Sequence, residues 1–151
     1  RGGVTVGALA VVNNLGDVTD PKSGEVMAGT RKPGTDEFAG TAAIISDMEG
    51  ELAMPFNQNT NLIAVATDAE LDKAGATKLA RMSSAGMART LSPAHSTFDG
   101  DMVFAFSTGE KKADVNQLGV LGAECVARAI VDAVLSATSM GGIPSAADLR
   151  I

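Results

Sequence analysis

Residues 4–12 are apolar or small at almost every position, and Thr5 is the only hydroxyl-bearing residue among them. Successive side chains of a β-strand point to opposite faces of the sheet, so this run predicts a strand that is covered on both faces. Such a strand has to be buried between other layers of secondary structure. The feature therefore indicates a layered α/β fold in which helices cover sheets.

Two further runs predict strands. Residues 62–66 form a compact apolar run, and residues 101–107 place three large side chains on one face of the strand. The three large side chains are Met102, Phe104 and Phe106. We also expect a short strand at residues 41–46.

The remaining connections before Thr60 are rich in turn-forming residues. The segment from Asn13 to Asp17 predicts a turn, and residues 18–40 are expected to form one long loop. Residues 49–59 are irregular and end in the polar run Asn57-Gln58-Asn59.

A first helix is indicated by a capping box. Thr67, with Glu70 three residues later, predicts that the helix begins there, and Ser92-Pro93 predicts that it ends there. Gly75 and Gly86 fall on its inward face, where they would allow one backbone to approach another closely. The inward face also carries Leu71, Leu79 and Met82.

A second helix is expected to begin at Asp114 and to end at Gly141-Gly142. Glu124, Arg128 and Asp132 would form its exposed ridge at i, i+4 spacing. The opposite face is apolar and includes Cys125, which we expect to be a core residue. The charged ridge interrupts the longest apolar stretch of the chain and argues against a membrane span.

Composition excludes several classes of function. The chain has 151 residues, enough for one domain, and its 45% hydrophobic and 20% charged residues are typical of a globular protein. With five Phe, no Trp and no Tyr, its core must be aliphatic. The net charge is −6, and the densest basic run, Lys111-Lys112, is too short to follow a nucleic-acid backbone. One Cys excludes an internal disulfide, and one His argues against a zinc site made of protein ligands alone.

Thr60 is the first candidate for chemistry, because it lies between a polar run and a buried strand. The simpler interpretation is a threonine at the edge of a strand. As a nucleophile, the hydroxyl would need a neighbouring base. Cleavage of the Asn59–Thr60 bond would free an α-amine, a group with an ordinary pKa of about 8, close enough to serve as that base. Asn59, small and polar, is compatible with an N-to-O acyl shift at this bond.

Asp99-Gly100-Asp101 is the second candidate. Residues two apart in an extended segment point the same way, so both carboxylates would face one surface, and the glycine between them allows close approach. Two acids so placed can orient a protonated amine or a hydroxyl. The simpler interpretation is a turn that leads into the strand at 101–107.

Asn13 and His95 are weaker candidates. Asn13 ends the first predicted strand, and its amide can donate to a developing oxyanion, although a turn residue is the simpler interpretation. His95 follows Ser92-Pro93 in what reads as a rigid connector, where loop packing is favoured over catalysis. Residues 138–142 have no predicted strand before them and therefore do not form a phosphate loop.

Four stretches of the chain occur in a specific order. They are GVTVGALAVVN at 3–13 with GDV at 16–18, NTNLIAVATDA at 59–69, AGMARTLSPAHS at 85–96 and FDGDMVFAFSTG at 98–109. Together they resemble the DmpA-type L-aminopeptidase/D-esterase family, which includes β-aminopeptidases and nylon-oligomer hydrolases. Each stretch is weak alone, but the ordered set is specific, and the resemblance spans most of residues 3–140.

In that family a precursor cleaves itself before a serine or threonine and yields two tightly associated subunits. The resemblance implies that residues 1–59 are the end of the first subunit and that residues 60–151 are the entire second one. It implies Thr60 as the nucleophile, Asn13 as the residue that stabilises the oxyanion, and an acidic pair at Asp99 and Asp101. Family members are longer, so this chain alone is not expected to be active.

The fold that the resemblance implies is a four-layer α/β/β/α sandwich, similar to N-terminal-nucleophile hydrolases but with its own connectivity. The implied reaction is hydrolysis of an amide at the amino end of a short peptide or amino-acid amide, with no cofactor and no metal ion. A threonine nucleophile with Asp99-Gly100-Asp101 is closer to the nylon-oligomer and general aminopeptidase branches than to the β-aminopeptidase branch. The family also implies a homo-oligomer, such as a tetramer of cleaved units. The single cysteine and the family together favour a cytoplasmic location, and the composition argues against nucleic-acid and membrane partners.

Two alternatives stay open. An ornithine acetyltransferase-like acyl transferase resembles this family in fold and in its threonine nucleophile, but passes the acyl group to an amino acid instead of water. The stretch at 98–109 favours the hydrolase. A non-catalytic relative would keep the Asn59–Thr60 bond intact and serve in binding or assembly.

Overall fold

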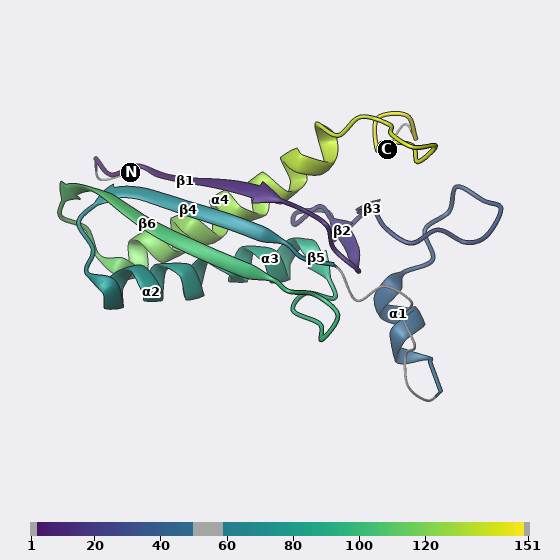
Figure 1. Ribbon diagram of the computed structural model, residues 1–151, viewed down its shortest axis with the longest axis horizontal. Coiled ribbons are helices and arrows are strands. Elements are labelled where there is room, and N and C mark those ends of the chain that lie inside the picture. The colour runs from purple at the N-terminus through teal and green to yellow at the C-terminus, as the bar shows by residue number, and fades with distance from the viewer. Residues whose placement is uncertain (1–2, 50–58, 150–151) are drawn as a thin grey trace.

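A sheet of strands β1, β4 and β6, with helices α2, α3 and α4 on one of its faces, forms the body of the computed structural model (Figure 1). The structure describes residues 3–49 and 59–149. The strands are β1 (Val6–Val11), β4 (Leu62–Ala69) and β6 (Met102–Lys111). β4 lies in the centre, antiparallel to β1 and parallel to β6. The predicted α/β class and these strands are confirmed, with β1 shorter and β4 and β6 longer than expected.

The parallel pairing of β4 with β6 requires a crossover, because parallel neighbours cannot be joined by a tight turn. α2 (Lys73–Ser83) and α3 (Ala85–Thr90) supply that crossover. The predicted end near Ser92-Pro93 is confirmed, since α3 ends at Thr90 and the chain continues as the short strand β5 (Leu91–Ser92). The single helix that was predicted is wrong, because Ser84 separates α2 from α3.

The start of the helical region differs from the prediction. Thr67 is buried within β4, where its Oγ1 donates to the carbonyl of Thr5 on the neighbouring chain segment at 2.9 Å. Strand pairing on both sides of β4 therefore overrides the local capping signal of Thr67 and Glu70. Asp72 caps α2 instead, and its carboxylate accepts from the Gly75 N–H at 2.7 Å.

α4 (Val115–Leu135) runs behind the sheet in Figure 1 and begins as predicted. The Asp114 carboxylate accepts from the N–H groups of Asn116 and Gln117 at 2.7 and 3.4 Å, as an N-cap does. These hydrogen bonds hold the pKa of Asp114 below its ordinary value. The expected exposed ridge is also present, and Arg128 forms an ion pair with Glu124 on it.

The predicted end of α4 at Gly141-Gly142 is wrong, because the helix ends at Leu135. Both glycines have a positive φ, 61° and 80°, and form a tight turn between Met140 and Ile143. Two successive residues with positive φ are the requirement of a type I′ turn, for which glycine is favoured. The glycine pair is therefore a turn signal beyond the helix and does not cap it.

The expected long loop at 18–40 contains strands. β2 (Asp17–Thr19) pairs with β3 (Val26–Ala28) on one side and with β5 on the other, in the order β3-β2-β5. This small sheet lies beside one end of the main sheet (Figure 1). The turn predicted at 13–17 leads from β1 into it.

The strand predicted at residues 41–46 is a helix, α1 (Thr41–Ser46). The buried Asp17 carboxylate accepts from the Thr41 N–H and from the Thr41 hydroxyl, both at 2.7 Å. A carboxylate at a helix N-terminus satisfies an unpaired N–H and interacts favourably with the helix dipole. This long-range contact favours the helix, and it is invisible in the local sequence. Most of the irregular segment predicted at 49–59 lies outside the described residues.

The core lies between the main sheet and the helices. Its most buried hydrophobic side chains are at most 1% exposed, and they include Ile63 and Val65 of β4, Leu79 of α2 and Ile130 of α4. The prediction of an aliphatic core is confirmed for the described residues, whose buried hydrophobic set contains no aromatic side chain. No helix in the described part of the chain has the length and apolar character needed to cross a membrane.

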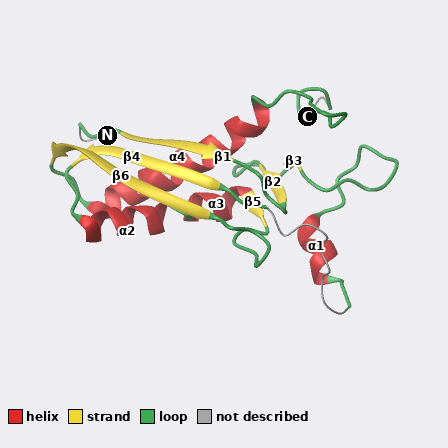
Figure 2. Ribbon diagram, in the orientation of Figure 1, coloured by secondary structure: helices red, strands yellow, loops and turns green. Residues whose placement is uncertain are grey.

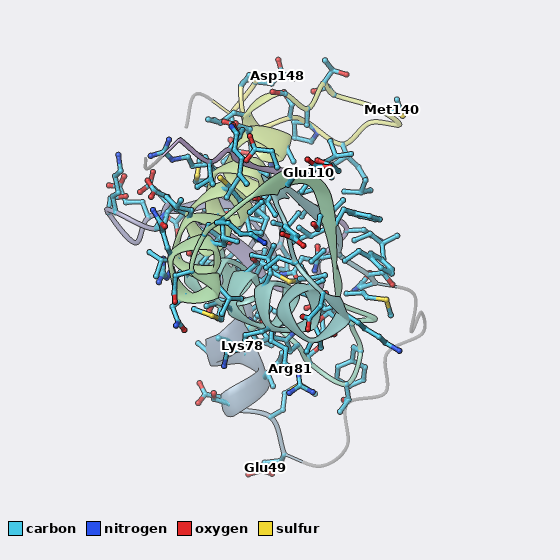
Figure 3. All side chains as sticks on the ribbon, turned by 90° about the vertical axis from the view of Figure 1, so that its left-hand side faces the viewer. Glu49, Lys78, Arg81, Glu110, Met140 and Asp148 are labelled. Atoms are coloured by element: carbon cyan, nitrogen blue, oxygen red, sulfur yellow. The ribbon has the colours of Figure 1, made fainter. Side chains whose placement is uncertain are left out.

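The other face of the main sheet is apolar and uncovered in the described residues. Leu9 and Val11 of β1 are 69% and 61% exposed, so the expectation that this strand is covered on both faces is wrong for this part of the chain. The register places Leu9 beside Ala64 of β4 and Phe104 of β6, and Val11 beside Leu62 and Met102. The exposed residues of β4 and β6 on this face are Leu62, Ala66, Met102, Phe104 and Phe106. Figure 3 views the molecule from one end and shows side chains that project from the face of the sheet opposite the helices.

The two glycines predicted on the inward face of the first helix differ in their surroundings. A Cβ at Gly86 would lie 2.3 Å from the carbonyl oxygen of Ala123 and 2.8 Å from the Cβ of Val126, so the backbones of α3 and α4 are in contact there. The nearest atom to a Cβ at Gly75 belongs to Leu71 of the preceding turn, at 3.0 Å. The predicted close approach is therefore confirmed at Gly86 and does not occur at Gly75.

We predict that Gly86→Ala lowers the free energy of unfolding by about 1–3 kcal/mol, because the added methyl meets backbone that cannot move aside. Gly75→Ala is the matched control, and its gain in helix propensity, up to about 1 kcal/mol, should offset the contact with Leu71. Urea unfolding of the two variants measures the difference. Equal stabilities would contradict the proposed contact between helix backbones.

Candidate active site

The candidate residues meet at the end of the main sheet where β1 ends and β4 and β6 begin (Figure 2). The parallel register that pairs Leu62 with Met102 continues toward the amino ends of both strands, so that Asn59 pairs with Asp99. The carbonyl of Asn59 accepts from the Gly100 N–H at 2.9 Å, and the carbonyl of Asn61 accepts from the Met102 N–H at 2.9 Å. Segment 59–61 thus lies along segment 99–101.

Thr60 is half-buried in this arrangement, and both of its polar groups are engaged. Its N–H donates to the main-chain carbonyl of Asn13 at 2.9 Å. Its Oγ1 donates to the carbonyl of Asn59, the preceding residue, at 2.6 Å. The hydroxyl therefore lies against the peptide bond whose cleavage would make Thr60 an amino terminus.

Asn13 reaches Thr60 because β1 and β4 are antiparallel, with Val11 opposite Leu62. The contact is made by its main-chain carbonyl, as described above. Its own N–H donates to the Asn61 Oδ1 at 3.1 Å. The structure therefore brings Asn13 beside Thr60, as the sequence predicted, and fixes its backbone on both sides.

The side chain of Asp101 is only 2% exposed. Its Oδ1 accepts from the N–H and the side-chain amide of Asn61 at 3.2 and 2.7 Å. Its Oδ2 accepts from the His95 N–H at 2.9 Å, and the His95 Nδ1 lies 3.4 Å away. Asp101 therefore fixes the strand that follows Thr60 and the loop that precedes β6.

Asp99 binds the same loop and the turn after β1. Its Oδ2 accepts from the Ser96 hydroxyl at 2.5 Å, and its Oδ1 accepts from the Leu15 N–H at 3.1 Å. Asp99 and Asp101 therefore both bind residues of the 95–96 loop, and each also binds a second, different segment of the chain. Among the hydrogen bonds of the described residues, none joins either carboxylate to the Thr60 hydroxyl.

Asn61 is a central residue that the sequence interpretation missed. It is fully buried and connects three parts of the site. In addition to the bond from Asn13, its side-chain amide donates to the Asn14 Oδ1 at 2.9 Å and to the Asp101 Oδ1 at 2.7 Å. The sequence did contain a signal for this role, because Asn61 is a second polar residue between Thr60 and a buried strand. A side-chain amide that is buried there needs several hydrogen-bond partners. Ser96, the partner of Asp99, was missed as well.

A pocket of about 510 Å³ opens beside this network and is lined in part by Asn13, Asn14 and Thr30. Pockets that bind small molecules usually have volumes of about 300–1,000 Å³ and a few polar groups on a largely apolar lining. The rest of the lining includes Val12, Val18, Ala28 and Val134. Asn13 is one of the residues that line this pocket, whereas Thr60, Asp99 and Asp101 do not line it.

Two other titratable residues, His95 and Cys125, contact neighbouring segments and have no hydrogen bond to Thr60 among those of the described residues. His95 is half-exposed and lies in the loop beside Asp101, which agrees with the interpretation of this residue as part of a loop. Cys125 lies half-buried on α4, where burial raises the pKa of its thiol and its Sγ donates to the Val6 carbonyl at 3.4 Å. In the described residues there is no group of three or more His, Cys, Asp or Glu side chains that could hold a metal ion.

The sequence and structure have recognisable relatives. The sequence model of peptidase family S58 matches residues 1–147. An uncharacterized aminopeptidase of Mycobacterium leprae is 35% identical over 165 residues, which cover 95% of this chain and 44% of that protein. An uncharacterized aminopeptidase of Mycobacterium tuberculosis (strain H37Rv) is 36% identical over 171 residues, covering 99% of this chain and 49% of that protein. The chain spans about half the length of the curated relatives it matches.

One solved structure shares the fold. The crystal structure of a protein from Pyrococcus horikoshii OT3 aligns with a TM-score of 0.60 and 24% sequence identity. The alignment covers 98% of this chain and 42% of that one. The fold of this chain therefore corresponds to a part of that larger protein.

We predict that Asn61→Ala lowers the free energy of unfolding by about 1–3 kcal/mol, because it leaves buried groups of Asn13, Asn14 and Asp101 with fewer partners. Gln117→Ala, on the exposed surface of α4, is the control and should change stability by less than about 0.5 kcal/mol. Urea unfolding followed by circular dichroism measures both. If Asn61→Ala changes the free energy of unfolding as little as Gln117→Ala does, the hydrogen bonds of Asn61 add little to stability.

Proposed function

Because this chain belongs to peptidase family S58, the DmpA family, we propose that it carries the nucleophile of a self-processing N-terminal-threonine hydrolase. The substrate is an amide bond at the amino end of a short peptide or amino-acid amide. The observation that carries this proposal is the hydrogen bond of 2.6 Å from the Thr60 hydroxyl to the Asn59 carbonyl. The names of the two mycobacterial relatives support the class of reaction.

Self-cleavage begins when the Thr60 oxygen attacks the carbonyl carbon of Asn59. The C–N bond breaks, the hydroxyl proton passes to the departing nitrogen, and an ester joins Asn59 to the Thr60 oxygen. Water then hydrolyses the ester, which restores the hydroxyl and leaves a carboxylate on Asn59. The hydrogen bond from the Thr60 N–H to the Asn13 carbonyl supports this step, because it fixes the nitrogen that becomes the amine.

In the catalytic cycle, the α-amine of Thr60 takes the proton from the hydroxyl, and the oxygen attacks the substrate carbonyl. The side chain of Asn13 donates to the oxyanion, and Asp99 and Asp101 orient the amine. The two carboxylates fix the loop and turn around Thr60, which supports a positioning role for both. Water releases the acyl group, so the reaction requires no cofactor.

The uncovered apolar face of the main sheet supports the four-layer α/β/β/α sandwich. A contiguous exposed apolar surface of this kind marks a contact with another layer or partner. The second sheet comes from the remainder of the protein, because the chain spans about half the length of its curated relatives. We further propose that the complete protein assembles into a homo-oligomer of cleaved units.

The first test is the intact mass of the full-length protein, combined with amino-terminal sequencing. We expect a fragment that begins Thr-Asn-Leu-Ile-Ala, because cleavage occurs before Thr60. Thr60→Ala should remain whole, since it lacks the attacking oxygen, and Thr60→Ser should still cleave. Thr77→Ala, which changes an exposed threonine of α2, is the matched control and should cleave like the wild type.

A wild-type protein that stays uncut under all folding conditions would reject the hydrolase and favour the non-catalytic relative. A cleaved protein that transfers the acetyl group of N-acetylornithine to glutamate, and hydrolyses no amino-acid amide, would instead identify the acyl transferase. The two measurements together separate the three functions.

The sandwich is tested by placing a charge on the uncovered face. We predict that Phe104→Glu lowers the free energy of unfolding of the full-length protein by more than about 2 kcal/mol, because the second sheet buries this position. Ala74→Glu, on the exposed side of α2, is the control and should change stability by less than about 0.5 kcal/mol. Chemical unfolding of both variants gives the comparison. A mild effect of Phe104→Glu would reject a second sheet on this face.

A further inference from the structure

The main-chain N–H of Gly100 occupies a position that the mechanism above leaves without a role. We propose that this N–H is an oxyanion donor, which stabilises the tetrahedral intermediate of self-cleavage and then that of substrate hydrolysis. The inference rests on the proposed function and adds a catalytic group to it.

The geometry in the uncut chain carries the argument. The Asn59 carbonyl oxygen accepts from the Gly100 N–H at 2.9 Å and from the Thr60 hydroxyl at 2.6 Å. Attack by the Thr60 oxygen converts this carbonyl oxygen into the oxyanion. Effective oxyanion donors lie about 2.7–3.1 Å from the position that the oxyanion takes in the transition state, and the distance to the ground-state oxygen is the starting point for that contact. The Gly100 N–H therefore already points at the atom where negative charge develops.

The same hydrogen bond is a rung of the β4–β6 ladder, continued to the Asn59–Asp99 pair. It differs from the other rungs because its acceptor is the carbonyl that is cleaved. When the Asn59 carboxylate leaves, the Gly100 N–H loses this partner. A substrate acyl group becomes attached to the same Thr60 oxygen and brings its own carbonyl oxygen to that place. One donor can thus serve both reactions.

The two neighbouring acids hold the donor in place. Asp99 is bound to Leu15 and Ser96, and Asp101 is bound to Asn61 and His95. Gly100 lies between two residues whose side chains are anchored on different segments. A donor that needs no rearrangement during the reaction stabilises the developing charge most effectively. The role of the acidic pair then includes fixing the peptide between them.

The absence of a side chain at position 100 fits the same role. A Cβ there would lie 3.0 Å from the Thr60 Oγ1 and 3.9 Å from the Asn59 carbonyl oxygen. The φ angle of Gly100 is not in the positive range that favours glycine. A side chain at position 100 would therefore press against the nucleophile, so glycine is favoured here by the close approach of Thr60 and not by the backbone conformation.

The decisive test replaces the Gly100 N–H with an ester oxygen in the full-length precursor, by semisynthesis with glycolic acid at this position. We expect self-cleavage, followed by mass spectrometry after refolding, to slow by about 10²–10³-fold, the usual effect of losing one oxyanion donor. The matched control is the same replacement at Gly7 of β1, which pairs with Ala66 away from the site. This control should cleave at the wild-type rate.

A second measurement applies to the cleaved wild-type enzyme and does not depend on the folding of a variant. With ¹⁵N-labelled glycine, the amide proton of Gly100 should move downfield when a peptide boronic acid forms a tetrahedral adduct on the Thr60 oxygen. The Gly7 amide proton serves as the internal reference and should not move.

The outcomes separate the two proposals. If the wild-type precursor cleaves and the precursor with the Gly100 ester cleaves at the same rate, the Gly100 role is overturned and the proposed function stands. An unchanged Gly100 resonance in the boronic acid adduct has the same meaning. A wild-type precursor that never cleaves would overturn both. Slow cleavage confined to the Gly100 ester, with a shifted resonance, would support both.

Discussion

The parallel pairing of β4 with β6 is the interaction on which the rest of the structure depends. It requires the α2–α3 crossover, which covers one face of the sheet and forms the core with α4. Because the register continues beyond both strands to the Asn59–Asp99 pair, it also sets Thr60 beside Gly100. The site is thus an extension of the sheet, and its geometry is determined by ordinary main-chain hydrogen bonds.

A polar network stabilises this extension where the regular strands stop. Asn61 is buried at its centre, and Asp99 and Asp101 bind the turn and the loop on either side. Buried polar groups of this kind are stable only when nearly all of their partners are present. The network therefore couples the position of Thr60 to segments that are distant in the sequence.

Local patterns were sufficient to predict the strands of the main sheet and the start of α4, whereas the roles of the candidate residues came from the resemblance to the DmpA-type family. The three strands of the main sheet followed from runs of apolar residues, and the start of α4 followed from Asp114. Thr60, Asn13 and the acidic pair were identified before their contacts were known, although their catalytic roles are still proposals. Predictions failed where distant contacts decide the conformation. Thr67 is held in β4 by its neighbours, and α1 begins where Asp17 binds it. Asn61 was missed for the same reason, because its partners come from three segments.

The antiparallel pairing of β1 with β4 has a consequence for the protein after cleavage. β1 precedes the Asn59–Thr60 bond and β4 follows it, yet the two strands are hydrogen-bonded neighbours from Val6–Thr67 to Val11–Leu62. A cut at this bond would produce two polypeptides that share one sheet. Neither could depart without breaking the ladder and exposing the core, so the nicked protein would behave as a single folding unit, inseparable short of denaturation.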